Sequence, residues 1–448
     1  MKESKLALKV CFFISFFILS ACSGPEYHKP QVNVPQHWVN KKNSTNKTVK
    51  LAELAWWQQF QDPQLNQFIS IGSTQSNQVL AAMANLDYAK AQLKQVKLAW
   101  IPGINLTSGY SELPYLGNPG YFFGLFPSYV LNISQQLKMQ KSASYQVEAN
   151  QYAKDGVRLT VIAQISGSYF TLLAQTQALQ LSNQLLAEQK KLLSFYQWQY
   201  KTGVISQDNL DDLKSEIQKT NAQIIMTKHN IVVSKNALHY LLNQNPGDLT
   251  LNTSFSKIKT NAVIPGNLPI NVLNNRPDVQ QAEALLKVAN ANVGVATSNL
   301  LPSISFDNLF MDTAHNNYVN LNEGLVNIPV LAPTAYGQIS VNKAQYKSAY
   351  INYVNTIRSA LRDIENDFSA YNAYSQKLKD NENAYKEEAR TCHLSRIRYQ
   401  QGIESGTQPN QCAIRLTRFA ITLNQDKLEK LMALVALYQD LGGGYRET

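Results

Sequence analysis

Apolar residues recur every seven positions in two long, proline-free stretches of this chain, at 138–200 and 335–399. The two series stand 199 residues apart, member for member: Ile165, Leu172, Leu179, Leu186, Leu193 and Tyr200, then Ile364, Tyr371, Leu378, Tyr385, Cys392 and Tyr399. A seven-residue apolar period is typical of helices that pack side by side along a narrow seam. Each stretch therefore predicts a helix of roughly 60 residues, about 90 Å long, which needs other helices beside it.

Before each long stretch the apolar period changes from seven to two. Apolar and small polar residues alternate over 104–110 and 128–134 in the first half, and over 303–310 and 326–330 in the second. Such alternation predicts a β-hairpin with one apolar and one polar face. In the second half we expect a polar loop over 312–323 between the two strands.

The chain therefore predicts two copies of one unit: a helix, a β-hairpin and a long helical hairpin. The first copy covers 51–245, starts with one helix over 63–98, has its β-hairpin at 101–137, and turns its helical hairpin near Gly203. Ser206 is expected to cap the helix after that turn. The second copy covers 277–442, with its β-hairpin at 301–333 and its turn near Gly402. Residues 246–276 form a connector and 443–448 a tail.

The first residues predict export. Residues 1–21 have a basic start, a short apolar run and the ending Leu19-Ser20-Ala21 before Cys22, which is typical of a cleaved signal peptide. That ending matches the lipobox pattern, so we expect Cys22 to carry lipid and residues 22–50 to form a tether. Ser23 replaces the Asp that favours inner-membrane retention, and the outer membrane is therefore the expected location.

Composition excludes several classes of function. The net charge is +10, and it falls to +8 when the signal peptide takes three lysines and one glutamate with it. The basic residues are spread along the predicted helices without a dense run, so we expect no binding to nucleic acid. The six histidines show no metal-site spacing, and no catalytic motif is present, which predicts neither an enzyme nor a metal site. Asp363, Glu365 and Asp367 are interpreted as a solvated face.

Two cysteines remain in the expected mature chain besides Cys22. Cys392 and Cys412 stand on opposite sides of Gly402, so a disulfide across the helical turn is one interpretation. Cys392 also occupies a heptad position, where a small buried apolar residue is the other interpretation. The sequence leaves the choice open.

The strands and helices together favour a membrane-anchored tube. Strands with one apolar and one polar face are typical of membrane β-barrels, although the edge of a soluble sandwich shows the same pattern. Four strands cannot close a barrel in lipid, so the barrel must be shared by two, three or four copies of the chain. Narrow apolar seams on otherwise polar helices suit a wall around a water-filled conduit.

Motifs spread over nearly the whole mature chain make it similar to the TolC-type outer-membrane efflux family, in its NodT-like lipoprotein branch. The matching residues are Cys22-Ser23-Gly24-Pro25-Glu26-Tyr27, Trp56-Trp57, Asp62-Pro63, Arg276-Pro277-Asp278, Ala289 to Ala296, Leu301-Pro302-Ser303-Ile304 and Gly442-Gly443-Gly444. The resemblance implies a homotrimer with a twelve-stranded outer-membrane β-barrel, four strands per protomer. It also implies a long periplasmic α-helical barrel, with the connector in an equatorial domain, and no cofactor apart from the lipid on Cys22.

The resemblance further implies partners: a periplasmic adaptor and an inner-membrane pump of the RND or a similar class. The family's Tyr-x-x-Gly-hydrophobic motif falls on Tyr200 with Gly203 and Val204, and on Tyr399 with Gly402 and Ile403. Gly203, Val204, Gly402 and Ile403 are thus the implied adaptor contacts. The implied cargo is small molecules or drugs; protein export through the same duct and a coiled-coil periplasmic scaffold are the alternatives.

The pore gate is where this chain departs from the family pattern. Gln408 and Gln411 stand where the family often has carboxylates, while Asn209 and Asp212 occupy the matching places in the first copy. These four residues and Tyr399 are the gate candidates. Because amides repel one another less than carboxylates do, we expect a gate that is held by hydrogen bonds and is less selective for cations.

Overall fold

The computed structural model describes residues 26–40, 49–111, 120–260, 264–313 and 318–446. The chain forms two compact units, each assembled from three separate segments. One, which we call the strand unit, contains residues 1–33, 83–153 and 278–357, and the other, the tip unit, contains 34–82, 154–277 and 358–448. The lipidation site expected at Cys22 lies outside the described residues.

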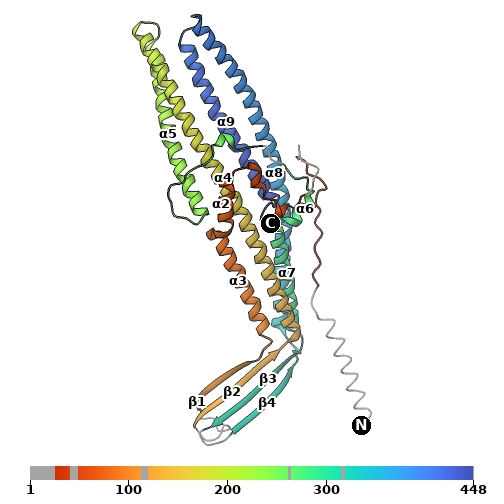
Figure 1. Cartoon of the computed structure of the whole chain (residues 1–448). Coiled ribbons are helices and arrows are strands. Elements are labelled where there is room, and N and C mark those ends of the chain that lie inside the picture. Colours follow the sequence, from red (N-terminus) through yellow and green to blue (C-terminus); the bar gives the residue numbers. More distant parts are fainter. Residues whose placement is uncertain (1–25, 41–48, 112–119, 261–263, 314–317, 447–448) are drawn as a thin grey trace. The chain divides into compact units, whose positions relative to one another are not determined.

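The strand unit holds one antiparallel sheet of four strands (Figure 1). Its order is β1 (Gly103–Ser111), β2 (Gly120–Leu131), β3 (Ser303–Thr313) and β4 (Tyr318–Asn327). The pairing of β2 with β3 joins the hairpin of the first repeat to that of the second. The outer edges of β1 and β4 have no partner strand among the described residues.

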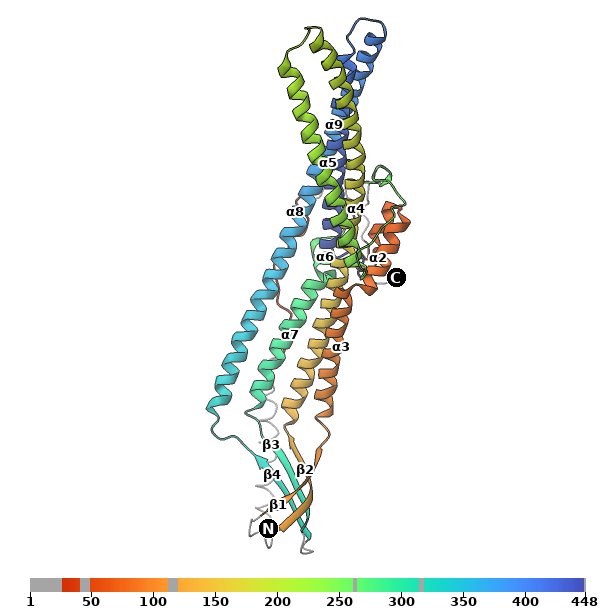
Figure 2. The same cartoon turned by 90° about the vertical axis from the view of Figure 1, so that its left-hand side faces the viewer.

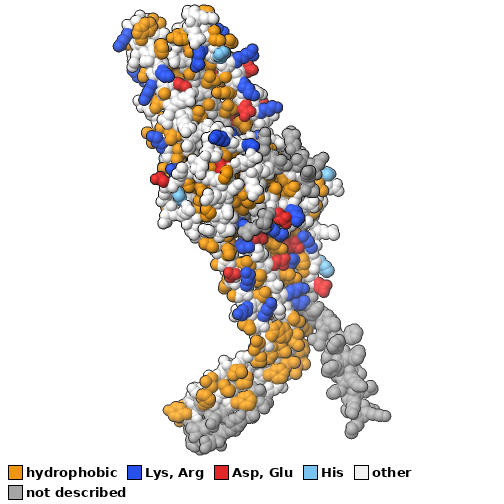
Figure 3. Space-filling model, viewed as in Figure 1, with side chains coloured by type: hydrophobic (Ala, Val, Ile, Leu, Met, Phe, Trp, Pro, Cys, Tyr) orange, Lys and Arg blue, Asp and Glu red, His pale blue; other side chains and the backbone are white. Residues whose placement is uncertain are grey.

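One face of the sheet is apolar and open to the surroundings. The register pairs Leu106 with Leu125 and Tyr110 with Tyr121, so these side chains share a face. Their exposed apolar neighbours on that face are Ile104, Phe123 and Phe306. Figure 3 shows hydrophobic side chains gathered over this sheet, with Lys, Arg, Asp and Glu concentrated on the helices. The opposite face carries polar contacts such as that from the Ser128 hydroxyl to Asp307, 2.6 Å long.

The expected polar loop over 312–323 is wrong. Strand β4 already begins at Tyr318 and ends at Asn327, before the expected end at 330. Strand β4 forms here because its backbone pairs with β3 as far as Asp312 and Tyr318. Backbone hydrogen bonds do not depend on the polarity of the side chains. Pro329 has no N–H to donate and cannot extend the ladder.

Four helices lead into the sheet (Figure 2). They are α3 (Asn77–Leu98), the first part of α4 (Ile133–Lys201), α7 (Pro277–Ser298) and the first part of α8 (Pro333–Gln400). Polar side chains join α4 to α7: the Ser142 hydroxyl lies 2.7 Å from Asn292, and Lys287 lies 3.1 Å from Glu148. These contacts are consistent with a wall of helices rather than an apolar bundle.

The single helix expected over 63–98 is two helices. Helix α2 spans Pro63–Gln75, α3 follows, and Ser76 between them has an extended backbone. The Ser76 hydroxyl accepts a hydrogen bond from the Val79 N–H, 3.3 Å away, as an N-terminal cap does. At the start of α2, the Asp62 carboxylate accepts hydrogen bonds from the backbone N–H groups of Gln64 and Leu65.

The tip unit also contains α5 (Gln207–Leu241), α6 (Pro269–Asn275) and α9 (Thr407–Asp440), with short 3-10 turns at Leu51–Glu53, Trp56–Phe60 and Phe255–Lys257. Its main core surrounds Trp56, which is fully buried and stacks on Tyr438 of α9 with ring centroids 5.1 Å apart. The connector is held to α9 by Lys427, whose ammonium donates to the Phe255 carbonyl. Burial lowers the pKa of Lys427 to about 8.

An apolar window within α4 has the length and composition of a membrane-crossing helix. Two thirds of that window (67%) is buried inside the chain, as in the core helix of a water-soluble domain. The window therefore gives weak support for a spanning helix.

Candidate functional site: the turns of the helical hairpins

The two helical hairpins turn through the same backbone motif. Gly203 and Gly402 have positive φ angles of 75° and 74°. In each turn the glycine N–H donates to the carbonyl of the tyrosine three residues earlier, 3.0 Å away. The N–H of the next residue donates to the carbonyl five residues before it, at 2.8 Å. This is the Schellman arrangement that ends a helix on a left-handed glycine. The sequence repeat is therefore also a repeat of backbone geometry.

Each turn presents one apolar side chain to the surroundings. Val204 is 63% exposed and Ile403 is 69% exposed, and the rings of Tyr200 and Tyr399 are also exposed. The turns lie at the ends of the α4–α5 and α8–α9 hairpins (Figure 1). Exposed apolar residues on two matching turns are suited to contact another protein.

Replacing the turn glycine is expected to lower stability slightly. In Gly402→Ala, open space surrounds the added methyl group, so the cost comes from the left-handed backbone and should be about 1 kcal/mol. Gly337→Ala is the matched control, because Gly337 lies within α8 with open space and an ordinary helical backbone. That substitution should raise stability slightly. Urea unfolding of the two variants checks the difference, and equal midpoints would contradict it.

The gate candidates of the second hairpin are not equivalent in the structure. Gln408 is exposed, whereas Gln411 donates from its side chain to the Tyr196 hydroxyl of α4, 2.9 Å away. A methyl group at Gly406 would come within 3.2 Å of the Tyr399 ring and 3.1 Å of the Phe195 ring. Tyr399 and Gln411 therefore lie where the second hairpin contacts α4, and sequence reasoning missed Tyr196 and Phe195.

In the first hairpin the candidates remain near the surface. Asn209 donates to the Ser206 hydroxyl at 3.0 Å, and Asp212 is exposed. Ser206 is the N-cap residue of α5, as expected, but its hydroxyl makes no capping hydrogen bond and accepts one from Asn209 instead. Neighbouring Asp211 accepts from Gln207 and from Lys214, and these hydrogen bonds lower its pKa. Asp211 is thus ionised at neutral pH.

Polar contacts link the second turn and α9 to the neighbouring helices. Glu404 accepts from the Ser395 hydroxyl at 2.6 Å and from Arg398 at 2.8 Å, and both hydrogen bonds lower its pKa. Farther along α9, Arg418 pairs with Glu216 of α5 at 2.5 Å, and the Thr417 hydroxyl donates to Glu188 of α4. The two hairpins are therefore connected by several polar contacts.

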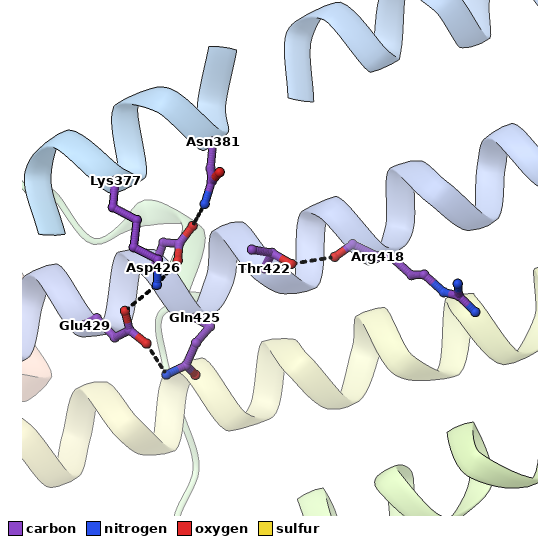
Figure 4. A network of polar contacts seen from close by, with 7 residues as sticks. All are labelled: Lys377, Asn381, Arg418, Thr422, Gln425, Asp426 and Glu429. Atoms are coloured by element: carbon purple, nitrogen blue, oxygen red, sulfur yellow. Dashed lines mark hydrogen bonds and ion pairs between the residues drawn. The ribbon is translucent and has the colours of Figure 1, made fainter. Parts of the chain in front are cut away.

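A lysine joins α8 to two acids of α9 in the middle of the tip unit (Figure 4). Lys377 lies 2.9 Å from Asp426, which is 1% exposed, and 2.8 Å from Glu429. Asn381 donates to the second oxygen of Asp426. Hydrogen bonds to Glu429 and Asp426 raise the pKa of Lys377, so the lysine that joins these two helices stays charged.

The interpretation of Asp367 as part of a solvated face is wrong. Burial, followed by the neighbouring Asp440, raises its pKa to about 8. Arg276 donates to the Asp440 carbonyl at 2.5 Å and also lies 3.5 Å from its carboxylate. The burial of Asp367 results from helix packing, because this side of α8 faces the connector and the end of α9. No local sequence signal marks this side of α8 as buried.

The two cysteines of the second hairpin form a disulfide. Cys392 of α8 and Cys412 of α9 are bonded, with their Cα atoms 5.3 Å apart. The interpretation of Cys392 as a free buried residue is therefore wrong. Glu388 lies beside them and makes a group of three potential metal ligands, but both sulfur atoms are already bonded to each other. We place no metal there.

Comparison with known proteins is consistent with this geometry. The profile of the family described as outer membrane efflux protein matches residues 73–244 and 268–443. The toluene efflux pump outer membrane protein TtgC of Pseudomonas putida is 25% identical over 100% of this chain and 97% of its own length. The probable outer membrane lipoprotein SilC of Salmonella typhimurium is also 25% identical, over 98% of this chain and 99% of its own.

Solved structures share the fold. The outer-membrane channel OprN aligns with a TM-score of 0.81 at 20% identity, over 94% of this chain and 99% of that one. The open-state MtrE outer membrane channel of Neisseria gonorrhoeae aligns with a TM-score of 0.80 at 20% identity, over 94% of this chain and 98% of that one.

Proposed function

This chain belongs to the outer membrane efflux protein family, and from that premise we propose that it is the exit duct of a tripartite efflux system. It receives small molecules or drugs from an inner-membrane pump through a periplasmic adaptor and releases them outside the cell. The observation that carries the proposal is the four-stranded sheet, because one face is apolar and exposed and both edges lack partners among the described residues.

Those open edges support a shared barrel. Unpaired backbone groups are very unfavourable in hydrocarbon, so β1 of one protomer must pair with β4 of the next. Three copies give twelve strands, an even number in the range of known membrane barrels. The homotrimer therefore satisfies the backbone of the sheet, places its apolar face against outer-membrane lipid, and leaves the α-helical hairpins to form a periplasmic barrel.

The two exposed turns are the proposed adaptor contacts. Val204 and Ile403 place a β-branched apolar side chain at the same position of the same turn, so a trimer would present six similar contacts. Such a ring suits an adaptor that recognises both repeats in the same way. The gate lies close to the turns, with Tyr399, Gln408, Gln411, Asn209 and Asp212 as its proposed residues.

A covalent lipid on Cys22 completes the proposal. SilC is named an outer membrane lipoprotein, and the Leu19-Ser20-Ala21-Cys22 segment matches a lipobox. Several acyl chains on one residue anchor a protein stably in a bilayer.

The experiment uses a strain that lacks this protein and measures accumulation of a fluorescent dye. Wild-type protein is expected to lower accumulation, and the double variant Val204→Asp/Ile403→Asp to lose that effect, because charge replaces the apolar contact. The control Val204→Ile/Ile403→Val keeps both turns apolar and should behave as wild type. Normal trimer migration of each variant on gels shows that assembly is intact.

Two outcomes would contradict the proposal. Full activity of the double Asp variant would exclude the turns as adaptor contacts. Unchanged dye accumulation in the deletion strain, together with loss of a secreted protein from the medium, would identify a duct for protein export.

A further inference from the structure

The disulfide between Cys392 and Cys412 lies at a mechanically sensitive place in the second hairpin. Each cysteine stands ten residues from Gly402, one on α8 and one on α9, and the bond closes a segment of sequence separation 20. It therefore fixes the two helices relative to each other just below the turn. Sliding or parting of α8 and α9 at this level requires the bond to break.

The first hairpin has no such bond at the equivalent positions. At the repeat offset of 199 residues, Leu193 and Leu213 replace the cysteines, and both belong to an apolar cluster that includes Ile217 and Ile414. Apolar contacts permit small sliding movements, whereas a covalent bond does not. The two hairpins of one protomer thus differ in the freedom of their tips.

The surroundings of the disulfide favour exchange with a thiol. Both cysteines line a cavity of about 390 Å³, together with His393 and Arg396. The Arg415 guanidinium lies 3.1 Å from the Cys412 sulfur and 2.7 Å from the Glu388 carboxylate. A neighbouring cation stabilises a thiolate, so Cys412 is the better leaving group. Glu388, 3.5 Å from the Cys392 sulfur, is neutralised by the same arginine.

We propose that the Cys392–Cys412 disulfide is a thiol-exchange site whose reduction by a small dithiol frees the tip of the second hairpin. A thiolate entering through the cavity attacks the Cys392 sulfur. The disulfide bond breaks, and its electron pair goes to Cys412 beside Arg415. The second thiol of the reagent then displaces Cys392, so the reagent becomes a cyclic disulfide and its two protons pass to the two cysteines.

The first test follows the chemistry on the full-length protein in detergent, with dithiothreitol as the probe. A brief pulse followed by alkylation and mass spectrometry should place the first adduct on Cys392. Arg415→Gln should slow reduction about threefold or more, because a leaving thiol with a higher pKa leaves more slowly. Arg418→Gln is the matched control: Arg418 lies one turn further along α9 and pairs with Glu216. Adducts spread equally over both cysteines, or equal rates in the two variants, would overturn this step.

The second test follows the movement. Reduction should speed amide hydrogen exchange in residues 388–416 about tenfold, since the restrained helix ends then open locally, and leave 190–216 unchanged. Cys392→Leu/Cys412→Leu copies the pair of the first hairpin, and its exchange should not respond to dithiothreitol. Unchanged exchange in the reduced wild type would overturn the inference.

The consequence for gating rests on the proposed function, and bilayer recording separates the two. Wild-type channels should open more often after reduction, and channels of the leucine variant should not respond. Steady current that ignores the reductant would overturn the gating consequence while leaving the duct intact. Absence of any current would instead count against the proposed function, and the exchange measurement would still decide whether the disulfide restrains the tip.

Discussion

Trp56→Ala is expected to lower the free energy of unfolding of the tip unit by about 3–5 kcal/mol, the usual range for removing a large aromatic side chain from a core. Trp56 is fully buried. Its ring stacks on Tyr438 and meets Phe60 edge to face, and its indole N–H donates to the Gly443 carbonyl at 3.3 Å. The alanine variant loses these contacts together, and they tie the turn at Trp56–Phe60 to the end of α9.

Chemical denaturation in detergent, followed by circular dichroism, measures this effect. Trp198→Ala is the matched control, because Trp198 lies 63% exposed near the end of α4 and should change stability by less than about 0.5 kcal/mol. Trp56→Phe should fall between the two, since it keeps a ring and loses the hydrogen bond. Similar midpoints for Trp56→Ala and Trp198→Ala would refute the role of this core.

Asp367→Asn is expected to stabilise the protein at pH 8 and to have little effect at pH 4. The pKa of Asp367 rises from 3.8 to about 8 on folding, because of burial and the neighbouring Asp440 and Asp363, although Arg276 acts in the opposite direction. Between these pH values the folded state holds a proton that the unfolded state has lost. Raising the pH therefore favours unfolding, and this loss of stability accumulates from about pH 4 to about pH 8.

The asparagine variant removes that loss. We expect a gain of about 2 kcal/mol at pH 8, well below the full linkage value, because the carboxyl group is partly exposed and solvent screens it. Unfolding midpoints at pH 4, 6 and 8 measure it. Asp380→Asn serves as control, since Asp380 is exposed on the same helix and accepts only from Gln376 among the contacts described. A gain that did not grow with pH would contradict the assignment of the proton to Asp367.

Periodic features of the fold could be predicted from the sequence. The seven-residue apolar repeat predicts the positions of the long helices, because the side of a helix that packs against another helix is apolar at each turn. The glycines at 203 and 402 locate the turns, because a left-handed residue without a side chain is needed to end each helix. Alternation located β1 and β3. It placed the second strand at 128–134, which is wrong: β2 spans Gly120–Leu131 and α4 begins at Ile133, because backbone pairing with β1 continues through the glycines and aromatic residues before 128. It also failed at β4, where polar residues are held by backbone pairing.

The candidate site could be predicted only in part. The turns were identified from the motif that carries Tyr200 and Tyr399, and the comparisons confirm the family that the motif implies. The contact from Gln411 to Tyr196 joins residues 215 apart, and no local pattern connects them. All five gate assignments stay predictions, because each depends on neighbouring protomers: Tyr399, Gln408, Gln411, Asn209 and Asp212.

By itself the sequence determined the repeated architecture, the positions of the turns and the family, since all three are written in short-range periodicity and local motifs. Only the tertiary structure decided the pairing of Cys392 with Cys412, the burial of Asp367 and the break at Ser76. These features depend on which faces of distant helices meet. That choice is made by packing over the whole unit, which leaves no regular trace in the order of residues along the chain.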